Sequence, residues 1–344
     1  MSKHVLITGG CGFIAHHVVD LLMSKTDWKI TTLDRLDFSG NLNRIHEIME
    51  KYNVEERKRV NIVFHDLKAE INPLVQNFIH KHGNVDIVLH LAASSHVDRS
   101  ITHPMEFILD NTIGTAHLLE FARKLPYNME TFLYFSTDEI FGVAPPGVAY
   151  GERDRYNSTN PYSASKAAGE ELCVAYENTY KLPIIVTHTM NVFGERQTPE
   201  KFIPLCVDRV RKGEKIFIHS DATKTHAGSR FYIHAADVAD ALLFLVTNKP
   251  QIPMDYGHAK CPKFNIVGKE EVDNLTLAKM VADAQGKELV YEMIDFHNSR
   301  PGHDLRYALS GDLMRSLGWE PKIAFSDRIK QVSDWYLENT RWLD

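Results

Sequence analysis

Short apolar runs alternate with amphipathic stretches through the first half of the chain. Apolar runs at residues 4–8, 29–33, 60–64, 86–91, 131–135 and 184–187 predict buried parallel strands. The amphipathic stretches between them predict helices, most clearly at 13–22, 107–124 and 162–180. Strands that alternate with helices are typical of the α/β class, so the first half predicts a doubly wound parallel sheet.

The pattern loosens after Asn191. Polar loops at 221–229 and 250–262 separate short apolar runs, at 264–267 and 289–292, from amphipathic stretches at 236–246, 275–284 and 326–337. We expect a smaller α/β lobe here, which folds over the carboxyl edge of the sheet and binds substrate. The predicted division is a dinucleotide-binding domain at 1–189, to which 230–262 returns, and a lobe made of 190–229 and 263–344.

Composition narrows the class of protein. The chain has 344 residues, of which 44% are hydrophobic, so it can bury a full core. Its formal net charge of −6 argues against a nucleic-acid partner. The four scattered cysteines show neither metal-ligand spacing nor a disulfide framework, and no apolar run approaches membrane-spanning length. With a strand at the very start and no signal peptide expected, we predict a soluble cytoplasmic protein without a metal or a membrane partner.

A glycine-rich turn follows the first strand. Gly10, Gly12 and Ala15 match the pattern G-x-G-x-x-G/A between a strand and an amphipathic helix. The glycines let the backbone approach a pyrophosphate, whose charge the helix N-terminus favours. Asp34 ends the second strand about 20 residues later, where a ribose-binding acid is expected. Together these features predict a Rossmann-like dinucleotide site, although a glycine turn alone is weak support.

Four polar residues follow the apolar strand at 131–135. Ser136, Thr137, Asp138 and Glu139 fall at its carboxyl end, where open α/β sheets bind their ligands. A hydroxyl beside two carboxylates offers a hydrogen-bond donor, an acid and a base within a few ångströms. The alternative is a solvated Asp-Glu turn that caps a helix.

Tyr162 and Lys166 are four residues apart on a predicted helix and therefore share one face. A nearby ammonium would lower the phenol's pKa from about 10 and make the tyrosine a better base. An ordinary amphipathic helix with a chance Tyr and Lys is the alternative. It becomes improbable beside the glycine turn and the Ser136-Thr137 pair.

These motifs resemble the extended short-chain dehydrogenase/reductases that act on nucleotide sugars, and among them the nucleoside-diphosphate-glucose 4,6-dehydratases. Beyond the motifs above, the resemblance rests on the stretches 95–100, 191–194, 199–204 and 300–307, and it runs nearly end to end. The Asp-Glu pair weighs most, because related 4-epimerases have no matching carboxylates. Departures are Ala15 for glycine, His16 for serine, Ser94 for glutamate, Met190 for asparagine and an unusual loop at 221–229.

The resemblance implies NAD, a nucleotide-hexose substrate and a homodimer formed through the helices at 107–124 and 162–180. The implied catalytic residues are Thr137, Asp138, Glu139, Tyr162 and Lys166. The residues expected to bind NAD are Gly9, Gly10, Gly12, Phe13, Ile14, Asp34, Asp66, Leu67, Ala92, Ala93, Tyr162 and Lys166. Those expected to bind substrate are Ser95, His96, Asn191, Lys201, Arg230, Asn265, Arg300 and His303.

The residue types suit a dehydration. Oxidising carbon 4 of a hexose to a ketone makes the hydrogen on carbon 5 acidic. Tyr162, assisted by Thr137 and Lys166, would take the 4-hydroxyl proton while hydride passes to NAD. Glu139 would then remove the carbon 5 proton and Asp138 would protonate the leaving 6-hydroxyl. A 4-epimerase and a catalytically silent NAD sensor remain alternatives, and the nucleotide base stays open between thymidine and uridine.

Overall fold

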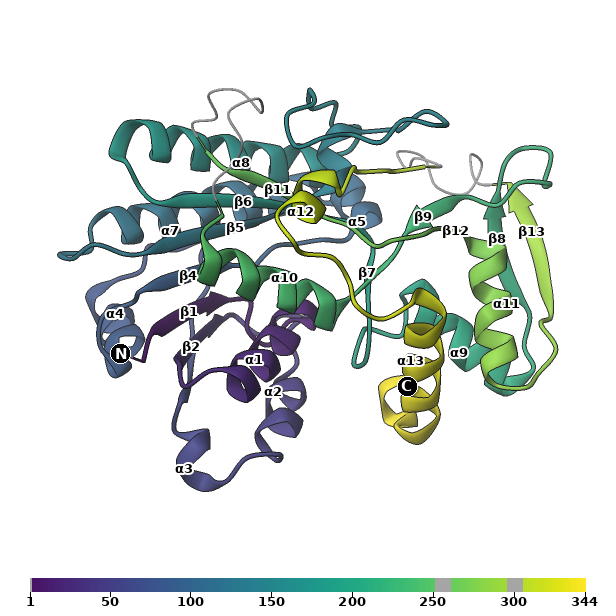
Figure 1. Cartoon of the computed structure of the whole chain (residues 1–344), viewed down its shortest axis with the longest axis horizontal. Helices are drawn as coiled ribbons and strands as arrows, with labels where there is room; N and C mark the ends of the chain where they lie inside the picture. The colour runs from purple at the N-terminus through teal and green to yellow at the C-terminus, as the bar shows by residue number, and fades with distance from the viewer. Residues whose placement is uncertain (1, 251–260, 296–305) are drawn as a thin grey trace.

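The computed structural model describes residues 2–250, 261–295 and 306–344. Its centre is a seven-stranded sheet in the order β11-β6-β5-β4-β1-β2-β3, in which every neighbouring pair is parallel (Figure 1). The strands are β1 His4–Thr8, β2 Lys29–Asp34, β3 Val60–Phe64, β4 Ile87–His90, β5 Thr131–Thr137, β6 Ile184–Thr189 and β11 Lys263–Ile266. This confirms the predicted Rossmann-like, doubly wound α/β class.

Helices cover both faces of the sheet (Figure 1). One apolar cluster joins the sheet to α1, α2, α10 and α12, through side chains such as Val19, Leu242 and Leu313. A second cluster joins the other face to α4, α7 and α8, through Val75, Leu118 and Cys173. Their bounds are α1 Phe13–Lys25, α2 Leu42–Met49, α3 Val54–Arg57, α4 Pro73–Ile79, η1 His80–His82, α7 Gly114–Arg123, α8 Pro161–Tyr180, α10 Ala235–Asn248 and α12 Asp312–Ser316.

The helix predicted at 107–124 is not continuous. It is built from α6 Pro104–Phe107, a π-helical stretch η2 Ile108–Ile113 and α7. Inside that stretch, Asn111 donates hydrogen bonds to Ser94 O and Ser165 Oγ, both at 2.9 Å. Such π-turns commonly mark functional positions, because the bulge re-aims the side chains around it. The preceding α5 Val97–Thr102 completes this region.

The smaller lobe gathers at one end of the sheet (Figure 1). Its core is a separate apolar cluster that includes Val207, Leu277 and Tyr336. It contains the parallel pair β8–β13 and, at its border with the sheet, the two-stranded pairs β7–β10 and β9–β12. The bounds are β7 Val192–Phe193, α9 Phe202–Lys212, β8 Ile216–Ser220, β9 Ser229–Phe231, β10 Ile233–His234, β12 Glu271–Asp273, α11 Asn274–Ala284, β13 Tyr291–Asp295, α13 Phe325–Glu338 and η5 Thr340–Trp342.

One segment differs from the expected division. The strand expected at 264–267 was assigned to the smaller lobe, but β11 pairs with β6 and forms the edge of the main sheet. The sequence of a short strand does not indicate which sheet the strand joins, because its pairing partners lie far away in the sequence. Residues 263–266 and the packed helix α12 therefore lie with the main sheet.

The described residues contain neither a membrane-spanning helix nor a metal-binding cluster. None of their helices is long and apolar enough to cross a membrane. Within the same part of the chain, no group of three His, Cys, Asp or Glu side chains could hold a metal ion. The four cysteines, Cys11, Cys173, Cys206 and Cys261, are free and buried.

Candidate active site

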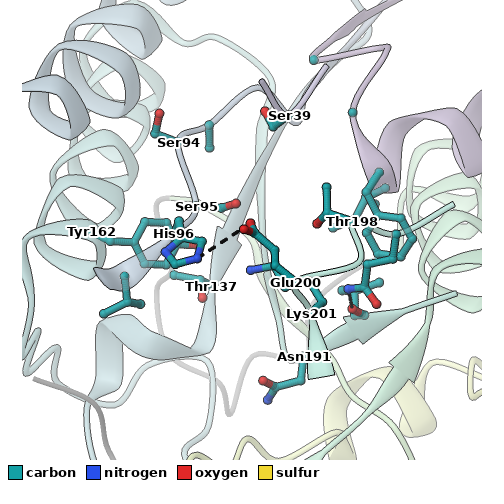
Figure 2. Close-up of a pocket in the computed structure, with 18 of the residues that line it drawn as sticks. Ser39, Ser94, Ser95, His96, Thr137, Tyr162, Asn191, Thr198, Glu200 and Lys201 are labelled. Carbon is teal, nitrogen blue, oxygen red and sulfur yellow. Dashed lines mark hydrogen bonds and ion pairs between the residues drawn. The ribbon is translucent and has the colours of Figure 1, made fainter. Parts of the chain in front are cut away.

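A cavity of about 870 Å³ runs along the carboxyl edge of the parallel sheet. The loops that follow β1, β2, β4, β5 and β6 line one wall, and residues of α9, β8 and β9 line the other. Figure 2 shows Ser94, Ser95, His96 and Tyr162 on one side of this space and Thr198, Glu200 and Lys201 on the other. The cavity therefore spans the boundary between the sheet and the smaller lobe.

At one end of the cavity is the glycine-rich turn. Gly9 has a positive φ of 71°, and Gly12 N donates to Gly9 O at 2.8 Å, which closes the turn before α1. Gly10 faces β2 instead: a Cβ there would lie 2.3 Å from Thr32 Cβ. Gly10 is therefore required for close packing of the turn on β2, and it does not line the cavity.

Most of the residues expected to bind NAD do line the cavity. They are Gly9, Gly12, Phe13, Ile14, Asp34, Asp66, Leu67, Ala92, Ala93, Tyr162 and Lys166. The Asp34 carboxylate accepts hydrogen bonds from Cys11 N at 2.9 Å and Leu36 N at 2.7 Å. These two bonds orient the carboxylate at the end of β2, as a ribose-binding acid requires.

The two adjacent carboxylates lie at the carboxyl end of β5. Thr137 caps the short helix η3 Asp138–Phe141, and its hydroxyl donates to Asp138 Oδ1 at 3.1 Å. Burial raises the pKa of Asp138 to about 6. Burial and the negative charge of Asp138 raise the pKa of Glu139 to about 7. Two carboxyl groups with pKa values near neutrality can act as an acid and a base.

Asn160 was not predicted as a site residue. It caps α8, with Pro161 at the first helical position, and its Nδ2 donates to Glu139 Oε2 at 3.2 Å. The cap therefore ties the start of the Tyr162 helix to the Glu139 carboxylate. The Asn-Pro pair signals the helix start in the sequence, but nothing in the sequence links it to Glu139.

Tyr162 and Lys166 are buried and line the cavity from one face of α8, as their spacing predicts. The predicted effect on the tyrosine is wrong. Lys166 Nζ donates to Phe135 O at 2.7 Å and lies 4.2 Å from the centre of the Tyr134 ring, so its charge is directed at β5. Burial and the charge of Glu139 instead raise the pKa of Tyr162, and burial lowers that of Lys166 to about 8.

Polar residues expected to bind substrate face each other across the cavity. Ser95, His96, Asn191, Lys201 and Arg230 all line it. His96 Nε2 lies 3.8 Å from Glu200 Oε1, a contact that bridges the sheet and the smaller lobe (Figure 2). Glu200 was not assigned a role, although it belongs to the stretch 199–204 on which the resemblance rests.

The structure does not place three of the predicted substrate-binding residues in the cavity. Asn265 does not line the cavity: it is fully buried in β11, and its Nδ2 donates to Tyr150 O at 3.0 Å and Ser310 O at 3.1 Å. Its amide therefore ties loops to the sheet edge, because β11 is a strand of the main sheet. Arg300 and His303 lie outside the described residues.

Known proteins match almost the whole chain. A family model described as GDP-mannose 4,6 dehydratase matches residues 6–332. A dTDP-glucose 4,6-dehydratase of Salmonella typhimurium is 35% identical over 99% of this chain and 94% of its own length. A trifunctional UDP-glucose 4,6-dehydratase, epimerase and reductase of Arabidopsis thaliana is also 35% identical over 99% of this chain, which spans 48% of that enzyme.

A solved structure is similar over the same length. The dTDP-glucose 4,6-dehydratase of Bacillus anthracis, crystallised in complex with NAD, has a TM-score of 0.83 and is 29% identical. The match covers 99% of this chain and 98% of that one.

Proposed function

The chain belongs to the GDP-mannose 4,6-dehydratase family, and we propose that it converts a nucleotide-activated hexose into its 4-keto-6-deoxy derivative with NAD. It is a hydro-lyase whose substrate is dTDP-glucose or UDP-glucose. The observation that carries this proposal is the Asp138-Glu139 pair, whose pKa values of about 6 and about 7 suit proton transfer near neutrality. An enzyme that only oxidised and reduced the sugar, without removing water, would not require that pair of carboxyl groups.

The cavity residues fit NAD. A Cβ on Gly12 would lie 2.8 Å from Gly9 O, so only glycine fits this tight turn, whose backbone a pyrophosphate would approach. Further along the wall, the buried hydroxyls of Ser136 and Thr189 have no hydrogen-bond partner among the described residues, so they can accept a polar ring substituent. Bound NAD supplies the acceptor for hydride from carbon 4 and its later donor to carbon 6.

We assign the proton transfers to residues of the chain. Tyr162, whose side chain hydrogen-bonds to Thr137, takes the proton of the sugar 4-hydroxyl in its phenolate form; burial disfavours that form, and the positive charges of Lys166 and of bound NAD would favour it. Lys166 holds the Tyr162 helix against β5 through Phe135 O and supplies positive charge nearby. Glu139 removes the carbon 5 proton, and Asp138 gives its proton to the departing 6-hydroxyl, which leaves as water.

The nucleotide diphosphate is assigned to the wall formed by the smaller lobe. Arg230 and Lys201 supply the cations, and arginine suits phosphate because its donors can pair with two oxygens. Asn191, Ser95 and His96 supply neutral donors nearby.

A mass measurement tests the proposed function. The protein is incubated separately with dTDP-glucose and with UDP-glucose, and the product is expected to be lighter than the substrate by one water. A 4-epimerase would give a product of unchanged mass, and an NAD sensor would give none. The preferred nucleotide identifies the base.

Three further points belong to the proposal. A homodimer through η2 and α8 is supported by Ile108, Leu109 and Ile113, which are large apolar residues exposed on η2. A cytoplasmic location is supported by the four free cysteines. The two-domain division is proposed with residues 263–266 moved to the dinucleotide-binding domain.

A further inference from the structure

Arg35 directly follows the ribose-binding Asp34, and its guanidinium is hydrogen-bonded to two other carboxylates, while a third, Asp66 Oδ2, lies 3.7 Å from its Nη1. Its Nε and Nη2 donate to Asp37 Oδ2 at 2.9 and 2.7 Å. Its Nη1 and Nη2 donate to Asp110 Oδ1 and Oδ2 at 2.6 and 2.8 Å. The pair with Asp110 is bidentate, which is the strongest geometry for arginine and a carboxylate. Four donor contacts of Arg35 are therefore occupied by carboxylates, in the cavity that Asp34 also lines.

The second carboxylate comes from a distant part of the chain. Asp110 lies in the π-helical stretch η2, and its side chain is only 5% exposed. Its Oδ2 also accepts a hydrogen bond from Ser94 Oγ at 2.5 Å. Ser94 stands where the resembling dehydratases often have glutamate. In this chain, η2 supplies a carboxylate beside that position.

The surroundings of Arg35 are rich in negative charge. Asp34 and Asp66 line the same end of the cavity, and Lys68 Nζ lies 3.5 Å from Asp66 Oδ2 and 3.8 Å from Asp110 Oδ1. The loop also winds tightly around Asp34: a Cβ on Gly40 would lie 2.9 Å from Asp34 Oδ1. An added phosphate here would meet carboxylates, and the nearest cations are already bound to them.

We propose that Asp37 and Asp110 determine the choice of NAD over NADP by occupying the guanidinium donors of Arg35 that would otherwise bind the 2′-phosphate of NADP. An arginine next to the ribose-binding acid is the residue type that accommodates that phosphate in NADP-dependent proteins. The inference rests on the proposed use of NAD. It adds that Asp34 alone does not set the preference, because a free Arg35 would offset the repulsion between Asp34 and the phosphate.

Breaking the network of Arg35, Asp37 and Asp110 has an energetic cost. Removing either carboxylate leaves the guanidinium with fewer partners at a site where its side chain is 22% exposed. An anion that replaces the lost carboxylate would then restore its hydrogen bonds. The 2′-phosphate carries up to two negative charges and is the group that NADP adds at this position.

Titration of the purified protein with NAD and NADP tests the proposal. The variants are Asp37→Asn, Asp110→Asn and the double variant, with both dissociation constants measured by calorimetry at one fixed ionic strength. We expect the double variant to bind NADP about tenfold more tightly than the unmodified protein, while its affinity for NAD changes by less than about threefold. The matched control is Asp312→Asn, which removes the carboxylate of an exposed Arg315–Asp312 pair on α12 and should change neither constant.

Arg35→Gln in the double-variant background separates two explanations. If Arg35 binds the phosphate, this third change removes the gain in NADP affinity. A gain that persists would show simple relief of repulsion and would overturn the proposal, as would an unchanged NADP-to-NAD ratio in the double variant. Asp37→Asn alone, at a side chain 26% exposed, supplies the test if Asp110→Asn does not fold. Binding needs no turnover, so these results are independent of whether the protein dehydrates a sugar.

Discussion

Asp138 and Glu170 are both buried carboxyl groups of the main domain, but their surroundings are opposite. Asp138 is 5% exposed and accepts a hydrogen bond from the Thr137 hydroxyl at 3.1 Å. Glu170 on α8 is fully buried, and it contacts His188 Nε2 at 3.2 Å, Lys263 Nζ at 2.8 Å and the Tyr156 hydroxyl. Burial raises the pKa of Asp138 to about 6. Burial acts in the same direction on Glu170, but His188 and Lys263 outweigh it and hold its pKa well below the ordinary range.

The difference separates a charge that supports the fold from one that is available for chemistry. Glu170 joins α8 to β6 and β11, since His188 and Lys263 lie on those strands. These partners compensate the charge of Glu170, which does not line the cavity at the carboxyl edge of the sheet. Asp138 and its neighbour Glu139 line the cavity, where burial outweighs the positive charge of Arg230 and raises their pKa values toward neutrality.

The largest expected effect, on the rate of dehydration, comes from changing Asp138 and Glu139. The double change Asp138→Asn with Glu139→Gln should lower the dehydration rate about 10³- to 10⁴-fold, because it removes both the acid and the base while keeping the side-chain shapes. Oxidation at carbon 4 should continue, so NADH absorbance should accumulate on the protein after substrate is added. Full dehydration by this variant would refute the roles of both carboxylates.

Removing the charge of Glu170 should affect the stability of the fold more than the rate of dehydration. Glu170→Gln leaves His188 and Lys263 without their anion, and we expect unfolding in urea to become easier by about 3 kcal/mol. The matched control is Glu171→Gln, the next residue of α8, whose side chain is exposed and which should change stability by less than about 0.5 kcal/mol. Equal effects of the two changes would contradict the assignment of Glu170 to the fold.

The pH dependence of turnover sharpens the comparison. The Asp138–Glu139 pair carries one proton between its two pKa values of about 6 and about 7. The assigned roles use the form with that proton on Asp138, which the higher pKa of Glu139 makes the minor of the two one-proton forms. Turnover should therefore fall about tenfold per pH unit below the lower value and above the upper one. A rate that is flat from pH 5 to pH 8 in initial-rate measurements would show that the pair does not carry the chemistry.

The smallest expected effect is a gain in stability. The pKa of Asp138 is raised on folding from 3.8 to about 6, so the folded protein binds the proton more tightly and loses stability as pH rises between these values. Asp138→Asn removes this loss and should stabilise the protein at pH 8 by about 1 to 2 kcal/mol, with little gain at pH 4. Glu170 has the opposite sign, because its lowered pKa contributes stability above pH 4.5 that is lost as pH falls. Urea unfolding at both pH values measures each difference.

Local patterns in the sequence were enough to predict the sheet and the centre of the cavity. The apolar runs predicted β1 to β6, because a parallel strand buried on both faces must be apolar along its length. The glycine turn, the residues at the end of β5 and the Tyr162–Lys166 spacing each depend on a few consecutive residues. Parallel strands end at one edge, so these motifs had to meet there.

Contacts between distant residues were decided only by the tertiary structure. Asp110 binds Arg35 across 75 positions, and Asn265 pairs with His188 across 77. The strand β11 pairs with β6 in the main sheet, which its local sequence does not indicate. Lys166 donates a hydrogen bond to Phe135 O, whereas the spacing of Tyr162 and Lys166 alone indicates a lowered pKa for the tyrosine. The physical reason is that hydrogen bonds and burial, which set these contacts and pKa values, depend on the partners that packing brings together. Hydrophobic periodicity indicates which face of a helix or strand is buried, but it does not indicate which distant residues that face will contact.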